Sequence, residues 1–190
     1  MIDYIKHLDQ QLLLAINSIH SPIFDTIMWW VSKTQTWVPL YIFIIYLLVK
    51  RSGKRIWIYL IAATVLILLS DQLSDLIKNH VQRLRPTHCP EIEGLVHLVR
   101  EYRGGLYGFV SSHAANSFAV ATFISLLFKK RYLTAIMFVY AVLVSYSRMY
   151  LGVHYPLDVL CGALLGTTIG WLVYFVINLI EKRTQDAHNS

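Results

Sequence analysis

The sequence predicts an all-α protein, a polytopic membrane bundle of about five transmembrane helices preceded by amphipathic helices in the membrane interface. Three observations support this fold class. Of the 190 residues, 56% are apolar and only 15% are charged, whereas soluble domains contain about 45–50% apolar and about 25% charged residues. The mean hydropathy is positive, at +0.50. Several uncharged stretches also approach the ~20 residues that a helix needs to cross a bilayer.

The first 33 residues are predicted to lie in the interface. Apolar residues recur at intervals of three and four from Ile2 to Ile19, with polar residues between them, which indicates a helix with one apolar face. A turn at residues 20–22 ends this helix. The segment 23–32 is too short to span a bilayer and contains Asp25, so we expect a second surface or re-entrant helix there.

Five stretches with few or no charges follow, and each is predicted to cross the membrane. They are Thr36–Val49, Ile56–Ile77, Phe109–Phe128, Leu133–Ser147 and Pro156–Ile180. The first is short and needs residues 33–35 to reach across. We therefore expect one domain over residues 1–190, with interfacial helices at 1–33, a transmembrane bundle at 34–181 and a cytoplasmic tail at 182–190.

Basic residues indicate the orientation of this bundle. Clusters at residues 50–55, 129–131 and 182–183 all fall on one side if the helices alternate, and the positive-inside rule makes that side cytoplasmic. Other basic residues fall on the outer side, where topology does not require them: Lys78, Arg83, Arg85, Arg100, Arg103 and Arg148. The formal net charge of +6 therefore calls for no nucleic-acid partner.

Three separate segments bring polar residues to the outer level. Residues 78–86 end the second span, residues 111–116 begin the third, and residues 147–158 follow the fourth. From these segments we expect three cations, two histidines, two serines and a carboxylate to surround a shared centre: Lys78, Arg85, Arg148, His113, His154, Ser111, Ser112 and Asp158. This inventory suits a phosphate, because guanidinium groups and a helix N-terminus both bind its oxygens. One histidine can attack phosphorus while the other protonates the leaving alcohol, and Asp158 is four residues after His154 and can orient its ring.

The pattern Lys78-x6-Arg85-Pro86, Ser111-Ser112-His113 and Ser147-Arg148-x5-His154-x3-Asp158 resembles the type 2 phosphatidic acid phosphatase superfamily. These are metal-independent membrane phosphatases that form a phosphohistidine. The resemblance implies that His154 is the nucleophile, Asp158 its partner and His113 the general acid. The phosphate-binding residues that it implies are Lys78, Arg85, Ser111, Ser112 through its backbone, and Arg148. The sequence departs from the family's usual Pro-Ser-Gly-His motif at Val110 and Ser112.

The resemblance also implies a substrate class and a location. We expect hydrolysis of a lipid phosphate or pyrophosphate at the outer face of the bacterial cytoplasmic membrane. Undecaprenyl pyrophosphate, lipid A and glycerophospholipid phosphates all remain possible substrates. No metal, cofactor, nucleic acid or obligatory protein partner is expected beyond the lipid substrate and the bilayer.

Three other functions can be weighed against this one. A metal site built from His80, His88, His113 and His154 is disfavoured because nearby cations would repel a divalent ion. A serine hydrolase using Ser112 lacks the nucleophile-elbow motif. An anion or lipid-phosphate transporter without hydrolysis is the remaining alternative, although the polar residues lie at one face and no inverted repeat is visible. For Arg83, Arg100 and Arg103, substrate binding and non-specific headgroup binding stay equally open.

Overall fold

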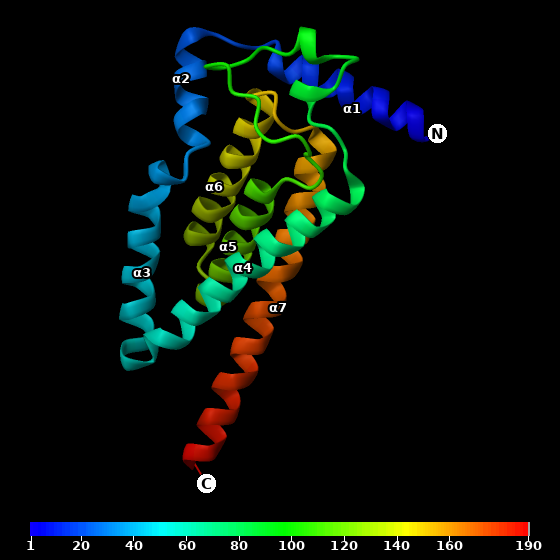
Figure 1. The fold of residues 1–190 in the computed structure, drawn as a ribbon. Helices are drawn as coiled ribbons and strands as arrows, with labels where there is room; N and C mark the ends of the chain where they lie inside the picture. The colour runs from blue at the N-terminus through cyan, green and yellow to red at the C-terminus, as the bar shows by residue number, and fades with distance from the viewer. Residues whose placement is uncertain (190) are drawn as a thin grey trace.

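The computed structural model describes residues 1–189, and that part of the chain contains helices but no strand (Figure 1). This result confirms the predicted all-α class. The elements in order are α1 (Ile2–Asn17), α2 (Pro22–Val31), η1 (Thr34–Trp37), α3 (Val38–Ser52), η2 (Gly53–Arg55), α4 (Ile56–Val81), η3 (Pro86–His88), η4 (Glu93–Leu95), α5 (Ser112–Phe128), α6 (Arg131–Tyr150) and α7 (Pro156–Asn189).

Helix α5 is the centre of the bundle and packs against α4, α6 and α7, most extensively against α7. Its contact with α7 is close because α7 presents glycines at every fourth position, Gly162, Gly166 and Gly170. A Cβ atom added at Gly166 would lie only 2.0 Å from the backbone oxygen of Ala115 on α5. Small residues at such an interface allow two helix backbones to approach each other, as in many membrane helix pairs.

All five predicted spans are helical, and three of them are confirmed by length and hydropathy as able to cross a membrane. These three are Ile56–Val81, Arg131–Tyr150 and the part of α7 up to Arg183. Helix α5 is apolar but has 17 residues, and α3 has 15. Helix α5 starts at Ser112 rather than at Phe109 because the side chain of Ser111 caps it, accepting from the Ala114 N–H.

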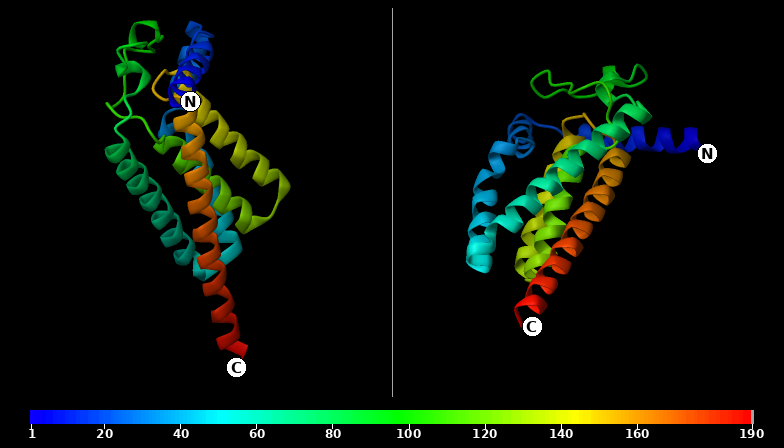
Figure 2. Two further views of the ribbon diagram at one scale, coloured as in Figure 1. Left: turned by 90° about the vertical axis from the view of Figure 1, so that its right-hand side faces the viewer. Right: turned by 60° about the horizontal axis from the view of Figure 1, so that its bottom comes forward.

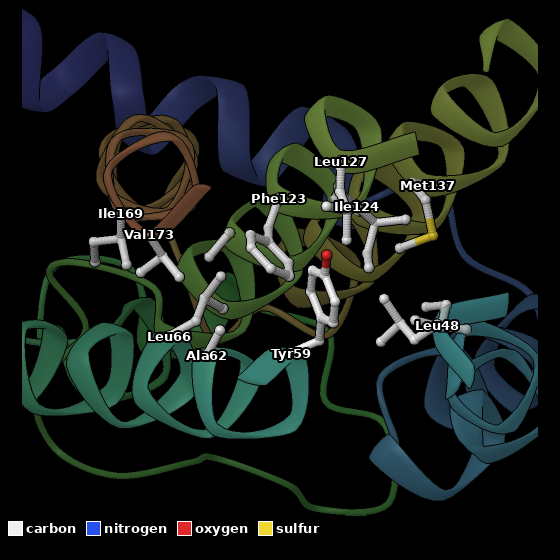
Figure 3. Packing of buried hydrophobic residues seen from close by; sticks show 14 of the residues in the cluster. Leu48, Tyr59, Ala62, Leu66, Phe123, Ile124, Leu127, Met137, Ile169 and Val173 are labelled. Carbon is white, nitrogen blue, oxygen red and sulfur yellow. The ribbon is translucent and has the colours of Figure 1, made fainter. Parts of the chain in front are cut away.

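The apolar core lies between α3, α4, α5, α6 and α7 (Figure 3). In this view Tyr59 of α4 points into the cluster beside Phe123 and Leu127 of α5, with Leu48 of α3 on one side. Large apolar side chains also cover the outward faces of the helices, for example Ile42, Ile61, Val139 and Leu164. An exposed apolar surface on several adjacent helices is typical of a protein surrounded by lipid.

Helix α1 lies across one end of the bundle, and α2 follows at the same end on the side away from the N-terminus (Figure 1). Both predicted N-terminal helices are therefore present. The apolar face of α1, which includes Tyr4, Leu8 and Leu12, is exposed, whereas Asp9 and Gln10 are buried toward the bundle. The face of α1 that meets the bundle therefore carries polar residues as well as Leu13, and an apolar face is left exposed on the other side, as expected for a helix in the membrane interface.

The other end of the bundle carries the basic clusters predicted from the sequence. The α3–α4 turn, the α5–α6 turn and the end of α7 lie opposite α1 (Figures 1 and 2). Helix α7 continues without a break past the predicted end of the span at residue 181 and reaches Asn189. Residue 190, the last residue of the predicted tail, lies outside the described residues.

Candidate active site

The three polar segments predicted from the sequence meet at the end of the bundle that α1 crosses. The last turn of α4 brings Lys78, whose Nζ contacts Ser112 Oγ in the first turn of α5. The loop after α4 brings Arg85, whose Nη1 lies 3.1 Å from His154 Nε2 in the α6–α7 loop. All three segments therefore contribute to one group of side chains.

His154 is 1% exposed and lies between a guanidinium and a carboxylate. Its Nδ1 atom is 3.5 Å from Asp158 Oδ2, a loose contact of the kind that tightens when a substrate binds. Asp158 Oδ2 is itself fixed by the Tyr155 N–H at 3.0 Å. Burial, together with the positive charges of Arg85 and Arg148, holds the pKa of His154 well below its usual value. The ring is therefore neutral at neutral pH, which a nucleophile requires.

The loop before α5 holds Arg85 in place by backbone contacts. Arg85 N–H donates to Leu106 O at 3.0 Å, and its Nε donates to Tyr107 O at 3.0 Å. Gly108 passes close to the catalytic group, because an added Cβ would lie 3.0 Å from Asp158 Oδ2 and 3.6 Å from His154 Nδ1. A side chain at this position would push the carboxylate away from the histidine.

Arg148 is the most deeply buried cation near the site, at 3% exposed. Its Nη1 donates to Ser32 Oγ and its Nη2 lies 3.3 Å from Tyr102 Oη, while its Nε has no hydrogen-bond partner among the residues that the structure describes. Arg148 and His113 line a cavity of about 130 Å³. Within the described residues neither Arg148 nor Arg85 forms an ion pair with a carboxylate. Buried positive charge without a counter-ion favours an anionic ligand.

A larger cavity of about 740 Å³ extends from the polar residues into the membrane-spanning part of the bundle. Ser112, His113 and Asn116 lie in its wall together with apolar side chains of α3, α4 and α6. The anion site is thus adjacent to a space suited to hydrocarbon.

The chain with this site also matches a known protein family. A family model described as the PAP2 superfamily matches residues 55–181, a range that includes every predicted site residue. The chain belongs to the PAP2 superfamily.

Two curated relatives cover nearly the whole chain. The chain is 41% identical over 189 residues to "Lipid A 4'-phosphatase" of Bacteroides thetaiotaomicron, with 97% of this chain and 84% of the relative aligned. It is 33% identical over 184 residues to the protein of the same name in Porphyromonas gingivalis, with 96% and 78% aligned. The crystal structure of Aquifex aeolicus LpxE is similar at a TM-score of 0.66, with 29% identity, 86% of this chain and 92% of that chain covered.

Within this PAP2 site, Ser111 differs from the sequence expectation. Its backbone N–H is not a free donor of the helix start, because it donates to the Asp158 carbonyl at 2.9 Å. The role of Ser111 in phosphate binding stays a prediction. Its hydroxyl is fully buried and serves as the N-cap of α5. Ser111 therefore ties the start of α5 to the start of α7. The first-turn N–H of Ser112 and the Lys78 side chain remain as the donors from this region.

Arg83 is a site residue that the sequence left open. Its two terminal nitrogens bond Asp158 and Asp9, at 2.9 and 2.6 Å. Arg100 and Arg103 are placed differently, since Arg100 lies over the Trp29 ring and Arg103 pairs with Glu93 on the outer loop. Nothing in the sequence of α1 marked Asp9 as the partner of Arg83.

Proposed function

We propose that this PAP2 protein removes the 4′-phosphate of lipid A, using His154 as the nucleophile. Its family and its relatives make the chain a membrane lipid phosphatase. Lipid A is the favoured substrate because both relatives that cover nearly the whole chain are named for that activity. The observation that carries the mechanism is the buried His154–Asp158 pair beside Arg85 and Arg148, two cations that form no ion pair with a carboxylate of the described residues.

In the first step the neutral Nε2 of His154 attacks phosphorus in line with the sugar oxygen, and the P–O bond to the lipid breaks. Arg85, Arg148 and Lys78 stabilise the charge on the non-bridging oxygens. His113 gives its proton to the departing oxygen, so the lipid leaves as an alcohol. Asp158 holds the Nδ1 proton and stabilises the positive ring.

In the second step His113, now neutral, takes a proton from water, and the hydroxide attacks the phosphohistidine. The P–N bond breaks, the electron pair returns to Nε2, and inorganic phosphate leaves. The sum is one lipid phosphate plus one water giving one lipid alcohol plus inorganic phosphate. His113 recovers the proton that it donated, so the site returns to its starting state.

The site is proposed to face the exterior of the bacterial cytoplasmic membrane. The basic clusters at the opposite end of the bundle support this orientation through the positive-inside rule (Figure 1). The lipid tails would remain in the bilayer and in the apolar cavity next to His113. The alternative of a transporter without hydrolysis has no support, because the relatives and the matched family are phosphatases.

A panel of lipids tests the substrate. Protein purified in detergent, with no membrane gradient, is incubated with lipid A, undecaprenyl pyrophosphate or phosphatidylglycerol phosphate, and released phosphate is measured. We expect the fastest release from lipid A, with mass spectrometry showing loss of the 4′-phosphate. Fastest release from another lipid would overturn the proposed substrate.

A pair of histidine variants tests the nucleophile in the same assay. His154→Ala should lose at least about a thousandfold in kcat, as expected when a nucleophile is removed. The matched control is His80→Ala, which removes an exposed histidine at the end of α4 and should keep the wild-type rate. Full activity of His154→Ala would contradict the assignment.

A further inference from the structure

Three charged side chains from distant parts of the chain form one network behind His154. Arg83 Nη1 donates to Asp158 Oδ1 at 2.9 Å, and Arg83 Nη2 donates to Asp9 Oδ2 at 2.6 Å. Both carboxylates are buried, with Asp158 0% and Asp9 2% exposed. The guanidinium also lies over the ring of Tyr155, 4.0 Å from its centroid. The Arg83 guanidinium is thus held by an ion pair to each carboxylate and by the ring of Tyr155.

The arrangement of charges determines how Asp158 meets His154. A guanidinium is a rigid planar fork and can engage both oxygens of one carboxylate. Here Asp9 occupies one arm, so Arg83 engages Asp158 through Oδ1 alone. The other oxygen, Oδ2, remains for the Tyr155 N–H and for His154 Nδ1.

Asp9 also bonds the first turn of the helix that carries Asp158. Its second oxygen, Oδ1, accepts from the Leu157 N–H at 3.0 Å, in the first turn of α7. Such a bond satisfies one of the backbone N–H groups that a helix start leaves free. Helix α1 is therefore bonded to α7 directly and, through Arg83, to Asp158.

From these contacts we propose that Asp9 and Arg83 are positioning residues for phosphoryl transfer. Asp9 holds one arm of Arg83, and Arg83 then orients Asp158 so that Oδ2 faces His154. Neither residue touches the reacting phosphate. This inference rests on the proposed roles of His154 and Asp158, and it makes interfacial helix α1 a part of the catalytic apparatus.

The position of α1 links the membrane to the contacts of Asp9 and Arg83. Tyr4, Leu8 and Leu12 are exposed on the face of α1 away from the bundle, while Asp9 and Leu13 are buried on the other face. An amphipathic helix of this kind is held in the interface by its apolar face. The bilayer thus fixes the depth of α1, and the depth of α1 fixes Asp9 against Arg83.

The test is a steady-state comparison of Asp9→Asn with Asp3→Asn, using the lipid that the panel shows to be cleaved fastest. The two variants make the same chemical change on the same helix, and Asp3 is exposed. Asn at position 9 keeps an oxygen for the Leu157 N–H but loses the charge that holds Arg83. We expect kcat to fall about tenfold, a barrier increase of about 1.4 kcal/mol, with KM unchanged within about twofold. Asp3→Asn should match the wild type.

Two further variants separate positioning from folding. Asp9→Glu restores the carboxylate and should recover part of the lost kcat. Arg83→Lys keeps the charge but cannot bridge two carboxylates, so its kcat should also fall. In Arg83→Lys combined with Asp9→Asn, the loss should be smaller than the product of the single losses, because both variants break one contact. All rates are divided by the folded protein recovered as a single peak in size-exclusion chromatography.

Three results would overturn the proposal. One is a kcat of Asp9→Asn equal to that of Asp3→Asn, and another is an increase in KM with kcat unchanged. The third is a loss that disappears after division by the folded fraction. His154→Ala is included so that a failure of the positioning role can be told apart from a failure of the proposed mechanism. If His154→Ala is inactive while Asp9→Asn is normal, only the positioning role fails, whereas an active His154→Ala removes the proposed mechanism itself.

Discussion

His154 combines features that an imidazole nucleophile needs. It is buried, its Nε2 atom faces Arg85, and its Nδ1 atom faces the carboxylate of Asp158. Arg148 adds a second positive charge that no carboxylate balances in the described part of the chain. Before a substrate binds, these cations disfavour a proton on the ring. In the proposed mechanism the same charges bind the phosphate and keep the nucleophile neutral.

This charge environment predicts the protonation state of His154. Burial and the charges of Arg85 and Arg148 lower its pKa below the usual value, so the ring gains a proton only at a more acidic pH. At pH 6.5 an ordinary imidazole is half protonated, but His154 should be neutral in the substrate-free protein. Nitrogen NMR of labelled histidine measures this, with the His154 signal assigned by its loss in His154→Gln. A ring half protonated at pH 6.5 or above would contradict the prediction.

The sequence predicted more of the site than of its supporting contacts. His113, Arg148, His154 and the other motif residues could be placed together because they follow or begin apolar spans at one membrane level. The bonds from Arg83 to Asp9 and Asp158 bridge 74 and 75 positions, and no local pattern records such a contact. The bond from the Ser111 N–H to the Asp158 carbonyl, at the start of α7, likewise joins two segments that are distant in the sequence.

Among the elements, the contact between α5 and α7 does most to position the site. Helix α5 brings His113 and α7 brings Asp158, and the glycines of α7 allow the two backbones to approach. The apolar stretches predicted that both helices exist, since a long uncharged run has few other stable conformations in lipid. The glycine spacing was also present in the sequence, but the partner helix on which it packs became visible only in the structure.

Gly166→Ala should destabilise the protein and reduce its activity. The added methyl group would lie 2.0 Å from Ala115 O, so α7 must move away from α5. Such overpacking costs about 1–3 kcal/mol of folding free energy. Replacing Gly by Ala in a helix gains about 1 kcal/mol of helix propensity, so a contact as close as this one should give a net loss of stability. Thermal unfolding in detergent should show a lower Tm.

The matched control for this change is Gly94→Ala. A Cβ at Gly94 meets nothing within 4 Å, so its Tm and phosphate release should equal those of the wild type. A wild-type Tm and rate for Gly166→Ala would show that the close contact between α5 and α7 is not required.

The whole molecule has two chemically different ends. One end carries α1, the loop 82–110 and the candidate active site, and the other carries the basic turns and the end of α7 (Figures 1 and 2). Apolar side chains cover the outer surface between them. In the proposed mechanism, this division lets a lipid keep its chains in the bilayer while its phosphate reaches the buried cations. It also explains why a chain this apolar has an excess of basic residues.

The two ends should lie on opposite sides of the membrane. Green fluorescent protein fused to the end of the chain should fluoresce, since that end is expected in the cytoplasm. Alkaline phosphatase inserted after Leu95, an exposed residue of the outer loop, should be active because it folds outside. A terminal fusion that does not fluoresce, together with an inactive loop insertion, would show that the orientation is the reverse of the proposed one.

The most direct measurement of the central claim is to trap the covalent intermediate. Wild-type protein is mixed with lipid A labelled on its 4′-phosphate, quenched within the first turnover in alkali, and digested for mass spectrometry. The proposed mechanism predicts a base-stable, acid-labile phosphate on the peptide that contains His154, and none in His154→Ala. A phosphate on any other residue, or rapid turnover by His154→Ala, would contradict it.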